Sequence, residues 1–163
     1  MFLGIYDCFD CEVPEIILEQ LALFTELCYL RNNDGSYLTE VIDEVLPQNI
    51  DMDFLHAKHD ENSIFLYNQN VISALRLQER STFRINPIYV HPDAQGQGLG
   101  TYVVKLWEKI AKGLGGEKIV IQSSLFKETL YFWHKSGYRD TRIKTSELDS
   151  GLPFSVQHME IIL

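Results

Sequence analysis

The first indication of the fold of this chain comes from residues 87–101, which read PIYVHPDAQGQGLGT. The apolar residues at the start of the stretch are typical of a β-strand, whereas the three glycines within five residues favour neither helix nor strand, because each costs backbone entropy. After the glycines, Leu99, Val103, Leu106 and Ile110 recur at the spacing of one helix face. The stretch therefore predicts a strand, a sharp glycine-rich turn and a long amphipathic helix.

This turn is well placed to bind an anion. The first N–H groups of a helix lack an intrahelical acceptor, and the helix dipole favours negative charge at that end. Glycines add the freedom for a ligand to approach bare backbone. A strand that leads through glycines into a helix N-terminus is thus a candidate phosphate site. A turn with a structural role alone is the alternative interpretation.

The glycine spacing distinguishes between phosphate-binding motifs. A dinucleotide fingerprint needs a glycine three residues after Gly98, where Thr101 stands, and a P-loop needs a lysine before its final serine or threonine. The pattern that fits is Gln95-x-x-Gly98-x-Gly100, directly after Val-His-Pro. It resembles the pyrophosphate-binding motif of the GNAT superfamily of acetyl-CoA-dependent N-acetyltransferases.

The resemblance implies an α/β fold of the GNAT (acyl-CoA N-acyltransferase) type, with a mixed, mostly antiparallel central sheet, one bulged strand and helices on both faces, as a single domain over residues 1–163. It also implies acetyl-CoA as acetyl donor, a primary amine as acceptor, direct transfer in a ternary complex, and no metal. The residues that it assigns to acetyl-CoA binding are Ile88, Tyr89, Val90, Gln95, Gly96, Gln97, Gly98, Leu99, Gly100, Thr101 and Trp133.

An irregularity in the strand before the turn is informative. Phe83 and Ile85 alternate in phase, but Ile88 and Val90 are shifted by one residue, and Pro87 at the shift cannot donate to a sheet ladder. An extra residue there, a β-bulge, restores the alternation; alternatively, the tyrosine between the shifted pair keeps the original phase. In GNAT proteins the corresponding strand is bulged and separates from the next parallel strand to admit the pantetheine arm. The resemblance implies that backbone groups of residues 88–90 bind that arm and polarise the thioester carbonyl.

Residues 132–138, FWHKSGY, resemble a second GNAT landmark, an aromatic pair followed by x-x-x-Gly-aromatic. Many members carry a tyrosine at the position of Trp133 as a proton donor, but an indole is no proton-transfer acid. Tyr131 lies roughly 200° around the helix and is expected to face elsewhere. Arg84 and Asn86 stand where some members place a glutamate base. The catalytic residues therefore stay unknown, and a catalytically weak GNAT-fold regulator that binds acyl-CoA and a partner protein is the alternative function.

The other elements follow from periodicity and turn signals. The expected elements are a strand over residues 1–9, a helix from Pro14 to about Leu30 with Ile17, Leu21, Phe24 and Cys28 on one face, a helix from Thr39 that stops before Pro47, a short helix over 51–58, a hairpin of 63–67 with 71–77, a buried parallel strand over 118–124, a helix over 126–136, and closing strands over 139–145 and 156–163.

The charge is uneven along the chain. Residues 1–62 carry 14 acidic and 2 basic residues, a net charge of −12, whereas residues 63–163 carry 9 acidic and 12 basic residues, a net charge of +3. Such an acidic part disfavours nucleic acid as a partner and attracts cations. It favours a cationic acceptor, such as a polyamine, an amino sugar or a basic peptide; a merely solvated acidic surface is the alternative.

Composition and cysteine usage bound the remaining possibilities. No apolar run is long enough to span a membrane, and the N-terminus lacks a basic leader, so we expect a cytoplasmic protein with reduced thiols and no membrane partner. The pairs Cys8/Cys11 and His56/His59 are too far apart for a zinc finger and are expected to be structural or surface residues. A homodimer is compatible with the resemblance.

Overall fold

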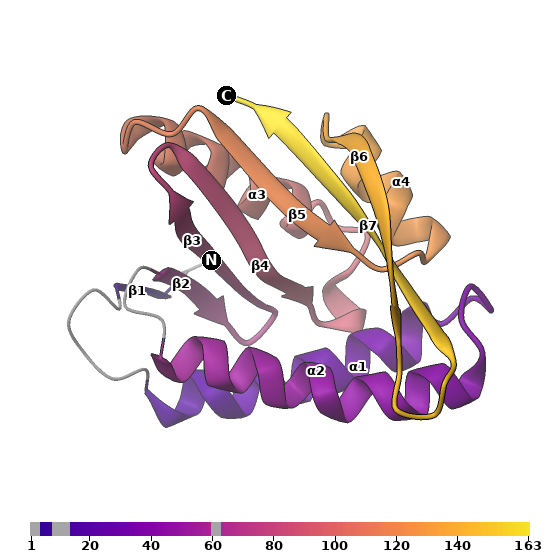
Figure 1. Cartoon of the computed structure of the whole chain (residues 1–163). Coiled ribbons are helices and arrows are strands. Elements are labelled where there is room, and N and C mark those ends of the chain that lie inside the picture. Colours follow the sequence, from indigo (N-terminus) through magenta and orange to yellow (C-terminus); the bar gives the residue numbers. More distant parts are fainter. Residues whose placement is uncertain (1–3, 8–13, 60–62) are drawn as a thin grey trace.

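The computed structural model of this chain describes residues 4–7, 14–59 and 63–163, and within these it describes the side chains of residues 14–50 and 63–163. The elements in chain order are β1 Gly4–Asp7, α1 Glu15–Asn32, α2 Thr39–His59, β2 Ser63–Asn68, β3 Val71–Glu79, β4 Thr82–Val90, a 3-10 turn Pro92–Ala94, α3 Leu99–Gly113, β5 Lys118–Ser123, α4 Lys127–Lys135, β6 Arg139–Glu147 and β7 Pro153–Ile162 (Figure 1).

One sheet of seven strands, in the order β1-β2-β3-β4-β5-β7-β6, organises these elements. Every neighbouring pair is antiparallel except β4 and β5, which are parallel and are connected through α3. The predicted mixed, mostly antiparallel sheet is confirmed. The β2–β3 hairpin is also confirmed, and its turn is held by Asn68 Oδ1, which accepts the N–H of Asn70 at 2.8 Å and that of Val71 at 3.0 Å.

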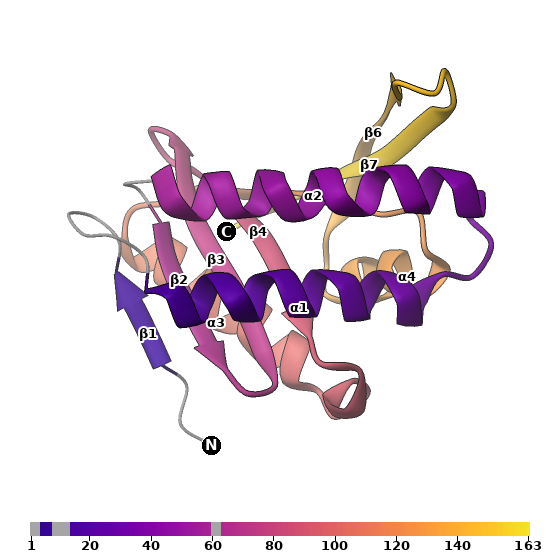
Figure 2. The same ribbon diagram turned by 90° about the horizontal axis from the view of Figure 1, so that it is seen from below.

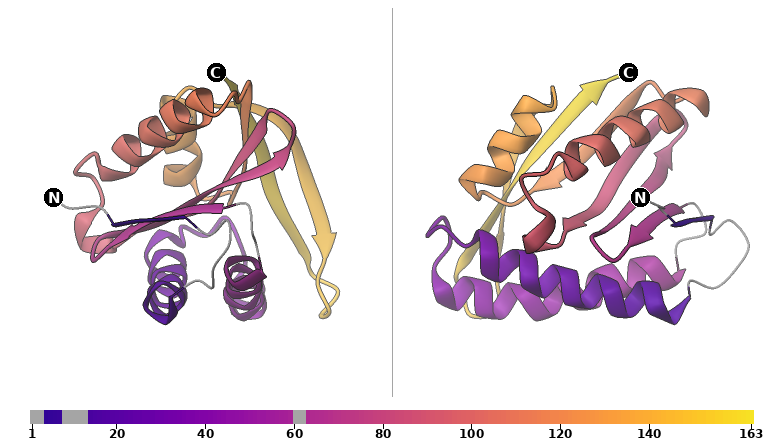
Figure 3. Two further views of the ribbon diagram at one scale, coloured as in Figure 1. Left: turned by 90° about the vertical axis from the view of Figure 1, so that its left-hand side faces the viewer. Right: turned by 180° about the vertical axis from the view of Figure 1, so that it is seen from behind.

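Helices cover both faces of the sheet, as predicted. α1 and α2 run side by side across one face, and α3 and α4 lie on the other (Figures 2 and 3). The predicted inner face of α1 is correct: Ile17, Leu21 and Phe24 pack against buried residues of β2 and β3. This burial, rather than helix propensity, is what stabilises α1 on the sheet.

The second helix does not stop before Pro47. α2 continues from Thr39 to His59, so that the predicted short helix over residues 51–58 is its C-terminal half. A proline inside a helix removes the hydrogen bond to the carbonyl four residues earlier, here that of Asp43. Pro47 and Asp43 both lie on the exposed side, where water solvates that carbonyl, while Val41 and Val45 bury the opposite side. Burial of the apolar side of α2 thus stabilises the helix by more than the exposed proline destabilises it.

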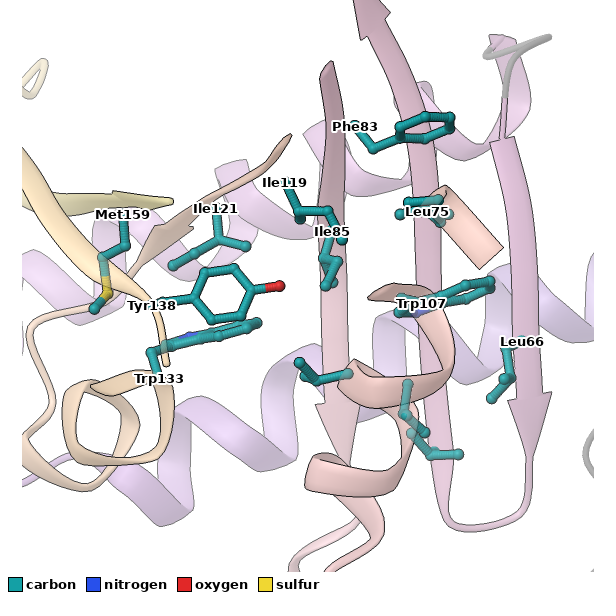
Figure 4. Packing of buried hydrophobic residues seen from close by; sticks show 14 of the residues in the cluster. Leu66, Leu75, Phe83, Ile85, Trp107, Ile119, Ile121, Trp133, Tyr138 and Met159 are labelled. Atoms are coloured by element: carbon teal, nitrogen blue, oxygen red, sulfur yellow. The ribbon is translucent and has the colours of Figure 1, made fainter. Parts of the chain in front are cut away.

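The core against α3 is centred on Trp107, which is fully buried between this helix and the sheet (Figure 4). The predicted stripe of α3 is half correct: Leu99 and Val103 are buried, but Leu106 and Ile110 lie one position before the buried Trp107 and Ala111. Val103, Val104 and Ala111 are buried with Trp107, whereas Leu106 and Ile110 are only partly buried at its edge. The apolar surface of this helix is wider than one i, i+4 row, so the sequence pattern identified the edge of the buried face.

The prediction of a buried parallel strand over residues 118–124 was only partly correct. In β5, Ile119 and Ile121 are buried under α3 and α4, but Val120 is partly exposed and Gln122 is exposed on the opposite face. The reason is that α1 and α2 do not extend over β5, and β6 and β7 bend down beside α2 instead (Figure 3). The α1/α2 side of β5, β7 and β6 therefore carries polar side chains.

Tyr37 connects the α1–α2 loop to the far end of the sheet. Its hydroxyl donates to the carbonyl oxygen of Ser155 at 2.7 Å and accepts the N–H of Leu125 at 2.8 Å, and its ring packs against Phe126 and Phe154. Burial raises the pKa of Tyr37 to about 12. The phenol is therefore neutral in the folded protein and holds the loop, α4 and β7 together.

Tyr37→Phe is expected to lower the free energy of unfolding by about 1–3 kcal/mol, because two buried backbone groups lose their partner. The folded pKa lies above the ordinary value near 10, so the stability from this hydroxyl is present below pH 10 and is lost as the pH rises through about 12. Urea unfolding at pH 7 and at pH 11 checks this. The variant should lose less stability between the two pH values than the wild type; an equal loss would contradict it.

Candidate functional site

The predicted bulge in β4 is present. Along β3 the pairing advances by two residues, from Ser73 to Leu75, while along β4 it moves by three, from Ile88 to Ile85, so one extra residue lies at Asn86-Pro87. The bulge leaves the carbonyl groups of Asn86 and Pro87 without partners in the sheet, and side chains of β3 donate hydrogen bonds to them. Ser73 Oγ donates to Pro87 O at 2.8 Å and accepts from Trp107 Nε1 at 2.9 Å, and Arg76 Nε donates to Asn86 O at 2.7 Å. The bulge is thus fixed by the core beneath it.

Beyond the bulge, β4 separates from its parallel neighbour. The two strands pair only where residues 82–84 of β4 face residues 118–120 of β5, although each strand continues further (Figure 1). We call this separation the splay. It is the feature that the resemblance implied for the strand before the glycine turn.

Two residues of β4 turn their backbone groups into the splay. The N–H of His91 binds Asn70 O at 2.8 Å, and Tyr89 pairs with Ile72 in the same alternating set, so the backbone of Tyr89 faces β3. The groups of Ile88 and Val90 consequently point the other way. In agreement, Val90 O accepts from Gln95 Nε2 at 3.0 Å rather than from β3. Of the three residues predicted to bind the pantetheine arm, Ile88 and Val90 have the suitable orientation, and Tyr89 does not present its backbone there.

The turn after β4 is built by its own side chains and glycines. Gln95 binds Val90 O, and Gln97 Nε2 donates to Asp93 O at 3.1 Å, so both amides support the loop. Gly96 and Gly98 have φ angles of +77° and +82°, the left-handed region that other residues rarely adopt. These features orient the backbone of the turn toward the start of α3.

The N-terminus of α3 is open. Gly98 is the N-cap and offers no side chain, and the first intrahelical bond runs from Tyr102 N to Gly98 O at 2.9 Å. The N–H groups of Leu99, Gly100 and Thr101 therefore have no acceptor within the helix. A Cβ atom on Gly100 would lie 3.2 Å from the Phe132 ring, so only glycine fits easily where α3 and α4 meet. Such a helix end attracts anions.

Trp133, the other predicted acetyl-CoA-binding residue, lies in the core. Its side chain is 4% exposed and packs edge-on against Tyr138, with ring centroids 4.9 Å apart (Figure 4). The neighbouring Phe132, which is partly exposed, is the aromatic ring that borders Gly100. Tyr131 is 65% exposed, so the expectation that it faces away from Trp133 is confirmed.

The hydroxyl of Tyr138 and the thiol of Cys28 both stay protonated. Burial raises the pKa of the Tyr138 hydroxyl, which has no hydrogen-bond partner among the described residues. Burial also raises the pKa of the Cys28 thiol to about 11, and Sγ donates to Val90 O at 3.3 Å. A protonated thiol is a poor nucleophile. Sequence reasoning treated Cys28 only as an apolar face residue, and only the three-dimensional structure places it beside β4.

On the α1/α2 side of the sheet, the strands β5, β7 and β6 carry a row of polar side chains that the sequence analysis did not predict. Gln122 of β5 lies opposite His158 of β7, which in turn lies opposite Arg142 of β6. Gln122 Nε2 and His158 Nε2 are 3.1 Å apart. Burial lowers the pKa of His158, and the positive charges of Arg142, Arg84 and Lys144 lower it further. These residues are distant in sequence, and no local motif marks them.

Two expected absences concern parts of the chain that are only partly described. Cys8 and Cys11 lie outside the described residues, as do the side chains of His56 and His59. In the remainder, residues capable of binding a metal ion do not gather in groups of three or more. Of the helices within the described ranges, none combines the length and the apolar character that crossing a membrane requires.

Comparisons with known proteins agree with this fold. A family model described as an acetyltransferase (GNAT) domain matches residues 32–163. None of the curated protein sequences compared with the chain matches it.

Among solved structures, a GCN5-related N-acetyltransferase from Rhodopseudomonas palustris is similar with a TM-score of 0.73 and 21% identity, over 99% of this chain and 95% of that one. The PaiA N-acetyltransferase from Thermoplasma acidophilum, in complex with coenzyme A, has a TM-score of 0.69 and 14% identity over the whole of both chains. A Bacillus subtilis acetyltransferase in complex with CoA has a TM-score of 0.59 and 18% identity, over 99% of this chain and 97% of that one. At such identities these likenesses concern the fold.

Proposed function

The chain belongs to the GNAT acetyltransferase family, and from this membership we propose that it transfers an acetyl group from acetyl-CoA to a primary amine. One observation carries the proposal: the splay, with the backbone of Ile88 and Val90 turned into it, leads directly to the open N-terminus of α3. The open N-terminus of α3 suits a pyrophosphate, and the splay suits the amide-bearing pantetheine arm. The CoA complexes of the structural relatives support the choice of ligand.

The residues present fit coenzyme A at the turn. The N–H groups of Leu99, Gly100 and Thr101 lack partners in the helix, and the glycines at 96 and 98 leave the approach to them open. A Cβ atom added at Gly96 or Gly98 would meet nothing within 4 Å, and the helix dipole adds positive potential. Gln95 and Gln97 act indirectly in this proposal, because their amides hold the turn.

The splay supplies the groups that suit the acetyl-bearing arm. The N–H groups of Ile88 and Val90 point away from β3, so neither is consumed by the sheet. The bound donor would supply an activated thioester, and in this proposal the N–H of Ile88 stabilises negative charge on its carbonyl oxygen. A preorganised donor of this kind can lower a barrier by roughly 3–4 kcal/mol.

No described side chain is assigned as general acid or base. The resemblance puts Trp133 at the position where many family members carry a tyrosine, and its indole is buried in the core. Cys28 is protonated, which argues against an acetyl-cysteine intermediate and favours direct transfer to the amine. A thiolate with a pKa near 8.5 leaves tolerably without a proton donor. The buried position of Trp133 also favours the second candidate function, a catalytically weak acyl-CoA-binding regulator.

A panel of primary amines incubated with acetyl-CoA, with release of the CoA thiol as the readout, separates the two functions. The proposed enzyme releases thiol with at least one amine, and the rate rises with pH as that amine loses its proton. Reactions without amine serve as the control. Tight acetyl-CoA binding without turnover over the whole panel would instead favour the regulator. The homodimer and the cytoplasmic location stay predictions.

A further inference from the structure

The α1/α2 side of the sheet carries a set of cationic side chains, Arg84, Arg142 and Lys144, around the partly buried His158. We call this set the basic face. Arg142 pairs with His158 across β6 and β7, Lys144 pairs with Val156 two residues along the same strands, and Arg84 pairs with Val120 of β5. Side chains two residues apart on a strand share a face, and so do paired residues. Arg142 and Lys144 are exposed there.

The basic face borders the splay. Val120 is the last residue of β5 that pairs with β4, and Gln122 follows two residues later on the same side of the sheet. Gln122 Nε2 lies 3.1 Å from His158 Nε2, so the polar row starts at the edge of the splay and runs outward to Arg142. An acceptor that reaches the splay from this side must pass the basic face.

Five of the six described acidic side chains of α1 and α2 point elsewhere; the exception is Glu44, whose Oε1 accepts the N–H of Ser150 at 3.1 Å in the β6–β7 turn. Ile17, Leu21 and Phe24 face the sheet from α1, and at 100° per residue Glu15, Glu19 and Glu26 lie on the opposite side, where they are exposed. In α2, Glu40 and Asp43 are exposed opposite Val41, Ile42 and Val45. On the basic side of the sheet, the carboxylate of Glu160 is paired with Lys118 at 3.5 Å. The described acidic helix residues thus give little support to a cationic acceptor, because exposed charges are screened beyond about 8 Å.

We infer that the acceptor amine carries an anionic group, a carboxylate or a phosphate, which Arg142 and Lys144 bind on the basic face. This inference rests on the proposed function, since it concerns the acceptor of the same transfer. The lowered pKa of His158 supports it: the imidazole is neutral at neutral pH, and the cations around it leave a positive potential at its ring. A bound anion would offset that potential, and the pKa of His158 would rise.

The test uses four amines of one chain length that differ at the far end: propylamine, 1,3-diaminopropane, β-alanine and 3-aminopropyl phosphate. Each is titrated into the full-length protein with CoA present, and NMR follows the His158 imidazole signal, assigned with His158→Gln. The same amines are assayed for thiol release from acetyl-CoA at two salt concentrations. The double variant Arg142→Gln/Lys144→Gln is compared with Lys109→Gln/Lys112→Gln, which removes two exposed charges from α3.

The two anionic probes should shift the His158 signal and raise its pKa, with the carboxylate and phosphate arms showing which anion is preferred. Arg142→Gln/Lys144→Gln should weaken this binding about tenfold, and the α3 variant should not. Thiol release should be faster for the anionic amines than for propylamine, and that advantage should shrink with salt. Equal binding of all four probes, no binding of the anionic ones, or a preference for 1,3-diaminopropane would overturn the inference. Anion binding without thiol release would leave it standing and count against the proposed transferase activity.

Discussion

Replacing Thr101 with glutamate is expected to remove most of the thermal stabilisation by acetyl-CoA while leaving the free protein at least as stable as the wild type. Thr101 is exposed at the third position of α3, where a carboxylate interacts favourably with the helix dipole and the open N–H groups. The same carboxylate would occupy and repel the site of a pyrophosphate. Stability and binding should therefore change in opposite directions.

The expected size follows from linkage. Acetyl-CoA at a hundred times its Kd adds about 2.7 kcal/mol of stability, and a roughly hundredfold weaker Kd would leave about 0.4 kcal/mol. Thermal unfolding with and without acetyl-CoA measures this difference. Thr101→Gln, which keeps the size without the charge, should retain most of the stabilisation. If Thr101→Glu responds to acetyl-CoA like the wild type, the start of α3 is a structural turn and the cofactor binds elsewhere.

The parts of this fold that the sequence predicted well are those with local causes. The hairpin of β2 and β3 follows from its Asn-rich turn, and the order of strand, turn and helix follows from the three glycines between β4 and α3. The bulge was also visible locally, because Pro87 interrupts the alternation of β4. Each of these features depends on residues within about ten positions of one another, so periodicity and turn chemistry were sufficient.

The prediction failed where tertiary packing outweighs a local signal. Pro47 is a strong helix breaker, but its position on the exposed side of α2 lets burial of the other side maintain the helix. The partial exposure of β5 could not be predicted, because it depends on how far α1 and α2 extend over the sheet. Local propensity contains no information on that coverage.

The polar groups around the splay show the same limit at the site. Cys28 of α1 binds Val90 O of β4, and Gln122 of β5 lies beside His158 of β7; only helix packing and sheet register bring these distant residues into contact. The net charge of the N-terminal part suggested a cationic acceptor, because a sum along the chain does not show which side of a helix each carboxylate occupies. We infer an anionic group from the arrangement of charges in space, and the cationic acceptor stays a prediction that the amine assays test.

Ile88→Pro is expected to reduce turnover by about 100- to 1,000-fold while acetyl-CoA still binds, because it deletes the N–H that we propose stabilises charge on the thioester carbonyl. Only proline removes a backbone N–H, and in most strand positions it would also break the sheet. Ile88 is an exception, since Tyr89 carries the bonds to β3 and the N–H of Ile88 points into the splay.

The matched control is Ile88→Ala, which loses a comparable part of the partly buried side chain but keeps the N–H. Turnover is measured with the best acceptor of the amine panel, and binding is measured by the thermal shift with acetyl-CoA. The loss of turnover in the proline variant beyond that in the alanine variant isolates the N–H, because both variants have lost the isoleucine packing. Equal turnover in the two would mean that this N–H does not act on the carbonyl. The N–H of Val90, two residues further along β4, also points into the splay. The thioester carbonyl would then lie beside Val90, and Val90→Pro would show the loss of turnover instead.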